Sequence, residues 1–523
     1  LTEWEASERA LESVWGCDIN PHAVEIASFR LLLEVVARTR VTDMDRLARL
    51  AMNLRTMDSL IPWERTTKQE ELFPFKDRLD AYATPKQRRE NAAFLQRPFH
   101  VVVGNPPYIT PKDVRKKTDY KLFWPDSCYM RYALSAPFAE RILSIGAADA
   151  FTGQITANSF LKRQFGVPVI EKVLPRFDVT HIVDTSGAFI PGHGTPTLII
   201  FARNRPPTQP TIKAILGKRG EPRKPANPEK GLVWSAIAAA GDEPDDSSPF
   251  ISVTSLSRES MASHPWSLGG GAAGEIHEAL ESAVSARLVP NVASRLGLMT
   301  ILKQDDLYFD PPPGLIEDGK FAVRIVEGVC VRDFYIAAPD PALFPYKSDA
   351  PTEAFDLPFE SPLLHFFWKY RGLLWARTST GFRTVRDRGL KFYEYPFYFP
   401  ETYAGPVISF ASIATHNHFV LSRGGNLFKQ SAPAIKLLPS ATLDDHFDLL
   451  GLLNSSSIGF WMRQVSHCKG AQGVGEGIKS EEWEQFYDYD STKLQQAPIA
   501  TRDRAPRIAL AAALDATACE RAK

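Results

Sequence analysis

One continuous apolar run of this chain ends abruptly at a polar, proline-rich segment. Residues 99–104 are Phe-His-Val-Val-Val-Gly, and the next four residues are Asn105, Pro106, Pro107 and Tyr108. A run of β-branched side chains predicts a buried strand of a parallel sheet, and the Gly-Asn-Pro-Pro stop predicts a rigid loop at its carboxyl end. Open α/β sheets bind ligands at that edge, so this loop is the first candidate for a functional site.

The segments on either side of this run predict an open α/β sheet. Residues 14–19 show the pattern of a short strand that ends near Asp18. Asn20 then suits a helix N-cap, Pro21 suits the first helical position, and residues 23–40 carry an apolar helix face. Further strands are predicted at residues 153–158, 179–184 and 198–201. We therefore expect an α/β core over residues 1–204.

The second half of the chain has a different composition. Residues 205–268 are predicted to be a linker or an excursion, because they begin with a stretch rich in proline, lysine and arginine. Aromatic strands alternate with turns over residues 269–500, which predicts a second domain of mixed α+β structure. Residues 501–523 are predicted to be the start of a truncated helical tail.

Composition excludes several classes of protein. The chain has 523 residues, no net formal charge and five widely separated cysteines, so no disulfide framework and no metal site are expected. No apolar run reaches about 18 residues and no signal peptide is present, so we expect a cytoplasmic protein without a membrane partner. Any affinity for nucleic acid must come from a local basic patch, because there is no global positive field.

The four loop residues suit chemistry on the exocyclic amine of a nucleobase, which is a poor nucleophile because its lone pair is delocalised into the ring. The side-chain oxygen of Asn105 and the carbonyl of Pro106 can accept both N–H hydrogens together, which favours a pyramidal nitrogen. Pro106 and Pro107 stiffen the loop, and Tyr108 offers a flat face for an extruded base. The alternative is a proline-stiffened turn without catalytic function.

Two carboxylates follow predicted strands at the same edge. Asp18 ends the first strand, where one carboxylate can accept both hydroxyls of a cofactor ribose. Asp58 follows the next expected strand and can accept from the amino group of the cofactor's adenine, with Leu60 and Ile61 packed against the ring. The alternatives are a helix-start carboxylate for Asp18 and a turn carboxylate for Asp58.

The order of these elements resembles the core of γ-type amino-group DNA methyltransferases. In addition, four segments are similar to those of the adenine-specific methyltransferase family of phage growth limitation (BREX-type) systems, namely residues 15–21, 190–197, 264–271 and 483–487. This resemblance covers nearly the whole chain. It implies a Rossmann-like, S-adenosylmethionine-dependent α/β domain followed by a DNA target-recognition domain, in a phage-defence or restriction-modification-like system.

The resemblance also implies a role for each matching residue. Asn105, Pro106, Pro107 and Tyr108 would be catalytic, and a flipped adenine would lie between Tyr108 and Phe189, for which a core position at a strand edge is the alternative. The residues that would bind the cofactor are Asp18, Ile19, Asp58, Ser59 and Asn105. The family carries a glycine-rich cofactor loop just before the Asp18 segment, and this chain begins after it. We therefore expect a fragment that binds S-adenosylmethionine weakly or not at all.

A basic and aromatic stretch of the second domain is the candidate DNA interface. Between residues 365 and 391 seven basic residues occur with a single acid, interleaved with aromatic side chains. This mixture is typical of surfaces that bind phosphates and stack bases, so we predict DNA contacts from Lys369, Arg371, Arg377, Arg383, Arg386, Arg388 and Lys391. The alternative is a solvated basic face with its aromatics in the core. Residues 415–418 together with 423–426 form a second candidate, with a hairpin turn as the alternative.

Together these features predict a site-specific DNA adenine-N6 methyltransferase whose partners are double-stranded DNA and other phage-defence proteins. Two alternatives stay open. Methyltransferases that modify protein glutamines share the loop motif, but they are compact and lack a long basic and aromatic second half. A truncated chain that binds DNA without catalysis is the other alternative.

Overall fold

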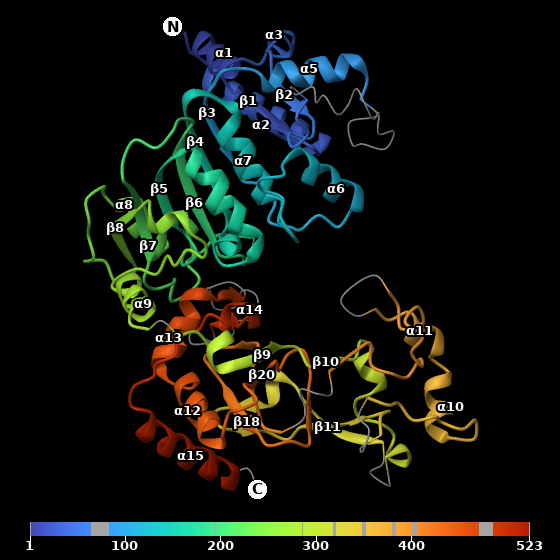
Figure 1. Cartoon of the computed structure of the whole chain (residues 1–523). Coiled ribbons are helices and arrows are strands. Elements are labelled where there is room, and N and C mark those ends of the chain that lie inside the picture. Colours follow the sequence, from blue (N-terminus) through green and yellow to red (C-terminus); the bar gives the residue numbers. More distant parts are fainter. Residues whose placement is uncertain are drawn as a thin grey trace. The chain divides into compact units, whose positions relative to one another are not determined.

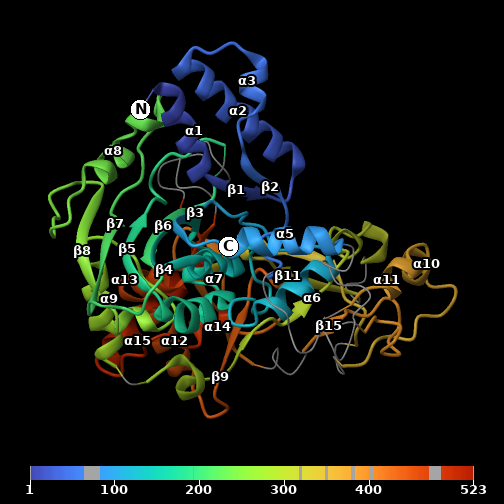
Figure 2. The same ribbon diagram turned by 90° about the horizontal axis from the view of Figure 1, so that it is seen from above.

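The computed structural model describes residues 2–63, 83–192, 194–284, 286–316, 321–347, 352–378, 383–399, 405–469 and 485–521 (Figures 1 and 2). Backbone contacts divide the chain into two compact units. The first comprises Leu1–Thr185, Thr197–Ile215 and Thr254–Pro265. The second comprises Ser186–Pro196, Leu216–Val253 and Trp266–Lys523.

The first two strands form a small parallel sheet. β1 (Trp15–Asp18) pairs with β2 (Asn53–Thr56), and Asp18 lies opposite Thr56. Helix α2 (Pro21–Thr39) connects them, and the Asn20 side chain accepts from the N–H of His22 at 3.0 Å, so the predicted helix start is confirmed. Helices α1 (Glu3–Ser13) and α3 (Met44–Ala48) complete this region, and their apolar side chains pack with those of α2.

A six-stranded mixed sheet in the order β3-β4-β6-β5-β7-β8 follows. Its strands are β3 (Phe99–Gly104), β4 (Gly146–Ala157), β5 (Asp178–Asp184), β6 (Thr197–Arg203), β7 (Thr211–Gly217) and β8 (Ile251–Ser257). β3 is parallel to β4 and β5 to β7, whereas β6 is antiparallel to both of its neighbours. The strands predicted at 153–158, 179–184 and 198–201 are confirmed as parts of β4, β5 and β6.

Helix α7 (Ser135–Ile145) packs along β3 and β4 (Figure 1). It approaches the end of β3 so closely that a Cβ atom on Gly104 would lie 2.6 Å from Cδ1 of Ile142. A larger residue at this position would require the Ile142 side chain to move. The glycine that precedes the Asn105–Tyr108 loop therefore allows α7 to pack closely against the end of β3.

The parallel pairing of β3 is as predicted, but the predicted burial is wrong. Val101 and Val103 are 61% and 76% exposed. Within the described residues β3 pairs only with β4, so its second edge has no neighbouring strand. The two sheets instead meet through aromatic rings: that of Phe99 in β3 lies 6.5 Å from Trp15 and 6.1 Å from Phe94 of α5 (Pro85–Leu95).

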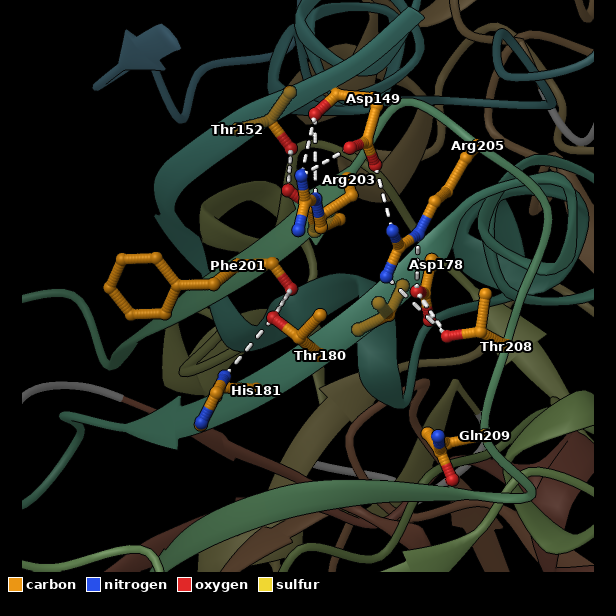
Figure 3. A network of polar contacts seen from close by, with 12 residues as sticks. Asp149, Thr152, Asp178, Thr180, His181, Phe201, Arg203, Arg205, Thr208 and Gln209 are labelled. Carbon is orange, nitrogen blue, oxygen red and sulfur yellow. Dashed lines mark hydrogen bonds and ion pairs between the residues drawn. The ribbon is translucent and has the colours of Figure 1, made fainter.

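A buried ion-pair network closes the end of the sheet where β5 begins (Figure 3). Asp178 is 2% exposed and accepts hydrogen bonds from Arg258 at 2.7 Å, from Arg205 at 3.0 Å and from Thr208 at 3.0 Å. Burial alone would raise the pKa of Asp178, but these bonds and charges outweigh it, so the pKa lies below its usual value. The segment 205–268, which the sequence predicts to be a linker or excursion, thus supplies β7, β8 and part of this network.

The second unit contains a four-stranded antiparallel sheet in the order β18-β16-β20-β9. Its strands are β9 (Ala293–Gly297), β16 (Val407–Phe410), β18 (Phe419–Ser422) and β20 (Ala434–Leu437). Three of its helices are α12 (Leu443–Leu453), α13 (Ser456–Val465) and α15 (Arg504–Arg521). α15, where the sequence predicts a helical tail, packs against α12, and Arg507 donates to Asp448 at 2.7 Å.

An aromatic cluster forms a further core of the second unit. It is built around Tyr308, Phe367 and Tyr395, each 1% exposed or less. The elements of this region include β10 (Thr300–Ile301), β11 (Ala322–Val326), β14 (Asp340–Leu343), α10 (Pro362–Trp368), α11 (Arg371–Trp375), β15 (Phe397–Tyr398) and β19 (Asn426–Phe428). The antiparallel pair β12 (Val331–Arg332) and β13 (Tyr335–Ile336) packs instead with the core of the four-stranded sheet. The remaining strands are β17 (Ile413–Ala414), β21 (His467–Lys469) and β22 (Phe486–Asp488). The predicted sequence of an α/β region followed by a mixed α+β region is confirmed.

Candidate active site

The loop after β3 presents its polar residues to solvent. Asn105 and Pro107 are exposed, Pro106 is buried and Tyr108 is half-buried. The hydroxyl of Tyr108 donates to Oδ1 of Asn105 at 2.7 Å, so the amide oxygen predicted to act in catalysis already has a partner within its own loop. Burial raises the pKa of Tyr108, so this hydroxyl remains protonated and able to donate at neutral pH.

The ends of β1 and β2 bring the predicted cofactor residues together. The side chain of Asp18 is exposed, and its Oδ1 accepts from the N–H of Asn20 at 2.7 Å. The neighbouring Ile19 is 55% exposed. Cys17 hydrogen-bonds Ser59, and its pKa is raised by burial and, in addition, by the nearby carboxylates of Asp18 and Asp58. Four of the five residues predicted to contact a cofactor therefore lie at one edge of this small sheet.

Asp58 is more enclosed than Asp18. Its Oδ1 accepts from the N–H of Leu60 at 2.9 Å, which is the turn contact of the alternative interpretation, and its Oδ2 accepts from the hydroxyl of Tyr120 at 2.5 Å. Burial raises the pKa of Asp58, although both hydrogen bonds oppose that rise. Leu60 and Ile61 are 1% and 5% exposed, so the apolar surface expected for a cofactor ring is covered by the protein itself.

Sequence reasoning missed the aromatic residues that connect the loop with these carboxylates. Helix α6 (Val114–Phe123) follows the Asn105–Tyr108 loop, and its Tyr120 reaches Asp58. Just after the helix, the indole N–H of Trp124 donates to the carbonyl of Leu60 at 2.7 Å. The i, i+4 spacing of Tyr120 and Trp124 is a signal for a buried helix face, but nothing in it indicates a partner 62 positions away.

Phe189 lies in the second unit, whereas Asn105 to Tyr108 belong to the first. Its ring is half-buried, and Nζ of Lys224 lies 5.2 Å from the ring centroid. A cation near this distance is attracted by the ring face. The predicted stacking of an adenine between Phe189 and Tyr108 remains a prediction.

Some of the side chains predicted to bind DNA are exposed, and others are hydrogen-bonded within the protein. Those with exposed side chains are Lys369, Arg371, Arg383, Arg386 and Arg388. Among them, Arg371 lies 4.6 Å from the ring centroid of Trp368, which is itself 44% exposed. Arg388 donates to the carbonyl of Pro396 at 2.5 Å, and Lys391 donates to Asp356 at 2.5 Å, so these two are partly committed to the fold.

Arg377 has a structural role instead of the predicted DNA contact. It is 3% exposed, and its guanidinium donates to backbone carbonyls of four residues at 2.7–2.9 Å, namely Leu302, Leu374, Phe392 and Glu394. A guanidinium saturated in this way cannot reach a phosphate without leaving the core. The prediction that Arg377 contacts DNA is therefore wrong.

Comparison with known proteins shows what the first part of the chain is similar to. Residues 12–189 match the family described as Eco57I restriction-modification methylase. A solved structure of the Type IIL restriction-modification enzyme MmeI in complex with DNA has a TM-score of 0.55 at 11% identity, covering 97% of this chain and 58% of that one. A nuclease-deletion mutant of the Type ISP enzyme LlaGI with a DNA substrate mimic has a TM-score of 0.54 at 9% identity, covering 99% and 49%. The fold is thus that of restriction-modification methyltransferases.

A more specific relative is the adenine-specific methyltransferase PglX of Streptomyces coelicolor, which is 38% identical over 520 residues. The match covers 94% of this chain and 42% of that protein, so the chain spans less than half the length of this relative. The Type II methyltransferase M.XhoI of Xanthomonas vasicola is 30% identical over 184 residues, covering 29% of this chain and 32% of that protein. The chain is a relative of the PglX adenine-specific methyltransferases, which confirms the resemblance predicted from its motifs.

No helix among the described residues is long and apolar enough to cross a lipid bilayer.

Proposed function

We propose that this chain forms part of a site-specific DNA adenine-N6 methyltransferase that uses S-adenosylmethionine and acts in a phage-defence system. The observation that carries the proposal is the exposed Asn105 amide in a rigid loop at the carboxyl end of a parallel strand. The relationship to PglX and the restriction-modification fold support the reaction and the choice of DNA as substrate.

The first unit offers a partial fit to S-adenosylmethionine. Asp18 and Ile19 combine an exposed carboxylate with an exposed apolar side chain, as a ribose and its attached ring require. Asp58 has a partner for each oxygen, so an adenine amine would have to use a remaining lone pair or replace Tyr120. When bound, S-adenosylmethionine supplies an electrophilic methyl group.

The chain's own residues orient the amine. Oδ1 of Asn105 would accept one N–H of adenine N6 and the carbonyl of Pro106 would accept the other, which favours a pyramidal nitrogen with an available lone pair. A bound S-adenosylmethionine, held by Asp18 and Ile19, would supply the methyl group, and the proton released from the amine would pass to water. Oδ1 of Asn105 has two lone pairs, so it can accept from the amine although the hydroxyl of Tyr108 already donates to it. The ring of Tyr108 offers a face on which the flipped base can stack.

A substitution series in the complete enzyme tests this proposal. Asn105→Ala should abolish methyl transfer to duplex DNA and leave DNA binding within about twofold. Tyr108→Phe keeps the ring and frees Asn105, so it should retain most activity, whereas Tyr108→Ala should raise KM for DNA and lower kcat. Equal loss of DNA binding and methylation in Asn105→Ala would mean that the loop is structural. Methylation of a protein glutamine without methylation of DNA would replace the proposed substrate.

A second experiment separates catalysis from binding alone. Calorimetry with S-adenosylmethionine, using the unmodified chain and its Asp18→Ala variant, measures whether the edge of the β1–β2 sheet contributes to cofactor binding. We expect Asp18→Ala to weaken the binding at least tenfold, because it removes the carboxylate that accepts from the ribose hydroxyls. Equal affinity of the two proteins would favour a DNA-binding protein without methyltransferase activity.

A further inference from the structure

The turn between β17 and β18 brings two histidines to one carboxylate. Nδ1 of His418 lies 2.7 Å from Oδ1 of Asp333, and Nε2 of His416 lies 3.9 Å from Oδ2 of the same residue. The two imidazole rings are 4.0 Å apart between centroids. One potential ligand atom from each of the three residues lies within 4.8 Å of the others. The sequence predicts this turn only as a second DNA-binding candidate or a hairpin.

The scaffold holds this arrangement in place. Asn417, between the two histidines, is buried, and its amide donates to the carbonyls of Leu453 at 2.7 Å and Ser455 at 3.1 Å. Asn417 is thus fixed inward, while the side chains of His416 and His418 on either side of it both face Asp333. The hydroxyl of Thr415 lies 3.0 Å from Nδ1 of His416, which leaves Nε2 of that ring facing Asp333.

The carboxylate is fixed from the other side. Asp333 lies in the turn between β12 and β13, and the N–H of the next residue, Phe334, donates to the carbonyl of Phe419 at 3.1 Å. The N–H of Phe419 in turn donates to Oδ1 of Asn454 at 3.0 Å. Both turns are therefore attached to the same strand and helix junction, although Asp333 and His418 are 85 positions apart. Little conformational entropy remains to be lost when a ligand joins the three side chains.

We propose that Asp333, His416 and His418 bind one divalent transition-metal ion, with Zn²⁺ the best chemical match. A tetrahedral zinc site with bonds of about 2.0–2.1 Å needs donor atoms roughly 3.3–3.4 Å apart. The observed separations, 2.7 Å to Oδ1 and 3.9 Å to Oδ2 of Asp333, lie on either side of this value, so one carboxylate oxygen can serve as the ligand after the carboxylate and the two rings rotate. Two imidazoles favour zinc over Mg²⁺ or Ca²⁺, which prefer all-oxygen ligands.

The surroundings allow a metal to enter and leave one position open. The side chains of His416 and Asp333 are each 51% exposed, and that of His418 is 14% exposed. Three protein ligands leave a fourth position for water or an anion. Arg332 and Arg463 are close enough to influence His416 electrostatically, so they favour an anion there. The bound ion would connect the β12–β13 turn to the β17–β18 turn.

Zinc titration of the untagged full chain tests this site. After treatment with a chelator, the chain should bind one equivalent of Zn²⁺ in competition with a chromophoric chelator, and Co²⁺ should give the visible absorption of a site with nitrogen ligands. His416→Ala and His418→Ala should each weaken zinc binding at least tenfold. Asp333→Asn keeps the shape of the side chain and removes only its charge, so it should weaken binding without altering the fold measured by circular dichroism.

Matched controls distinguish this site from adventitious binding. His22→Ala and His365→Ala remove exposed histidines outside the cluster, and Cys519→Ser removes an exposed thiol. All three should bind zinc as the unmodified chain does. Unchanged affinity in folded His416→Ala and His418→Ala, or weakening by the control substitutions, would overturn the proposal. Less than half an equivalent of bound zinc at micromolar concentration would also overturn it.

Discussion

Replacing Arg377 should separate the structural arginine from the DNA-contacting ones. Arg377→Met keeps most of the side-chain volume but removes four hydrogen bonds to buried or partly buried carbonyls. A hydrogen bond from a charged group contributes about 1.5–3 kcal/mol, and some carbonyls will regain water or other partners. With about two bonds lost without replacement, we expect the second unit to lose roughly 3–6 kcal/mol of unfolding free energy.

Arg386→Met provides the matched control, because Arg386 is exposed and stands 5.3 Å from the ring centroid of Trp375. It should change stability by less than about 0.5 kcal/mol. Calorimetric unfolding should show the second unit melting on the order of 10 °C lower in Arg377→Met and nearly unchanged in Arg386→Met. DNA binding at several salt concentrations should give Arg386→Met a salt slope smaller by about one. A structural role of Arg377 would be refuted if Arg377→Met unfolds at the same temperature as the unmodified chain and loses as much DNA affinity as Arg386→Met.

Two carboxylates yield further predictions. Asp178→Asn should destabilise the first unit by roughly 2–4 kcal/mol, since Arg205 and Arg258 lose their shared partner. Folding lowers the pKa of Asp178, so the stabilisation that its charge provides is present above the unfolded-state pKa and is lost as the pH falls through the folded-state pKa. The free energy of unfolding, measured from pH 7 to pH 3, should therefore decrease more steeply for the unmodified chain than for the variant. Asp445 caps α12 and pairs with Arg504, which lowers its pKa to about 2. Its contribution should therefore disappear between about pH 4 and pH 2, and an unchanged acid profile for Asp445→Asn would contradict this.

Local signals in the sequence predicted the local structure. Asn20 and Pro21 act as cap and first helical residue because their preferences depend on backbone geometry within a few positions. The Asn105–Tyr108 loop follows its strand for the same reason, since glycine and proline terminate a strand whatever surrounds it. Such signals also placed Asp18 and Asp58 at one edge of a parallel pair.

The sequence alone could not predict contacts between residues that lie far apart in the chain. In the sequence Arg377 looks like its exposed basic neighbours. Its partners are backbone carbonyls of residues as far away as Leu302, and a backbone acceptor cannot be recognised from the residue type. The predicted burial of β3 was wrong because apolar side chains show only that a strand can be buried. They do not show whether a neighbouring element covers it. The cluster of Asp333 with His416 and His418 could not be predicted, because its spacing matches no metal-binding motif.

The aromatic contact between the two sheets of the first unit affects how a ligand is held. Trp15, Phe94 and Phe99 join them through ring faces and edges, with no ladder of backbone hydrogen bonds between β1 and β3 among the described residues. Rings can slide over one another at small cost, whereas a paired strand must break bonds to shift. The spacing between the Asp18 carboxylate and the Asn105 amide therefore depends on side-chain contacts, among them the hydrogen bonds of Tyr120 and Trp124. A molecule that touches both groups would strengthen the connection between the two sheets.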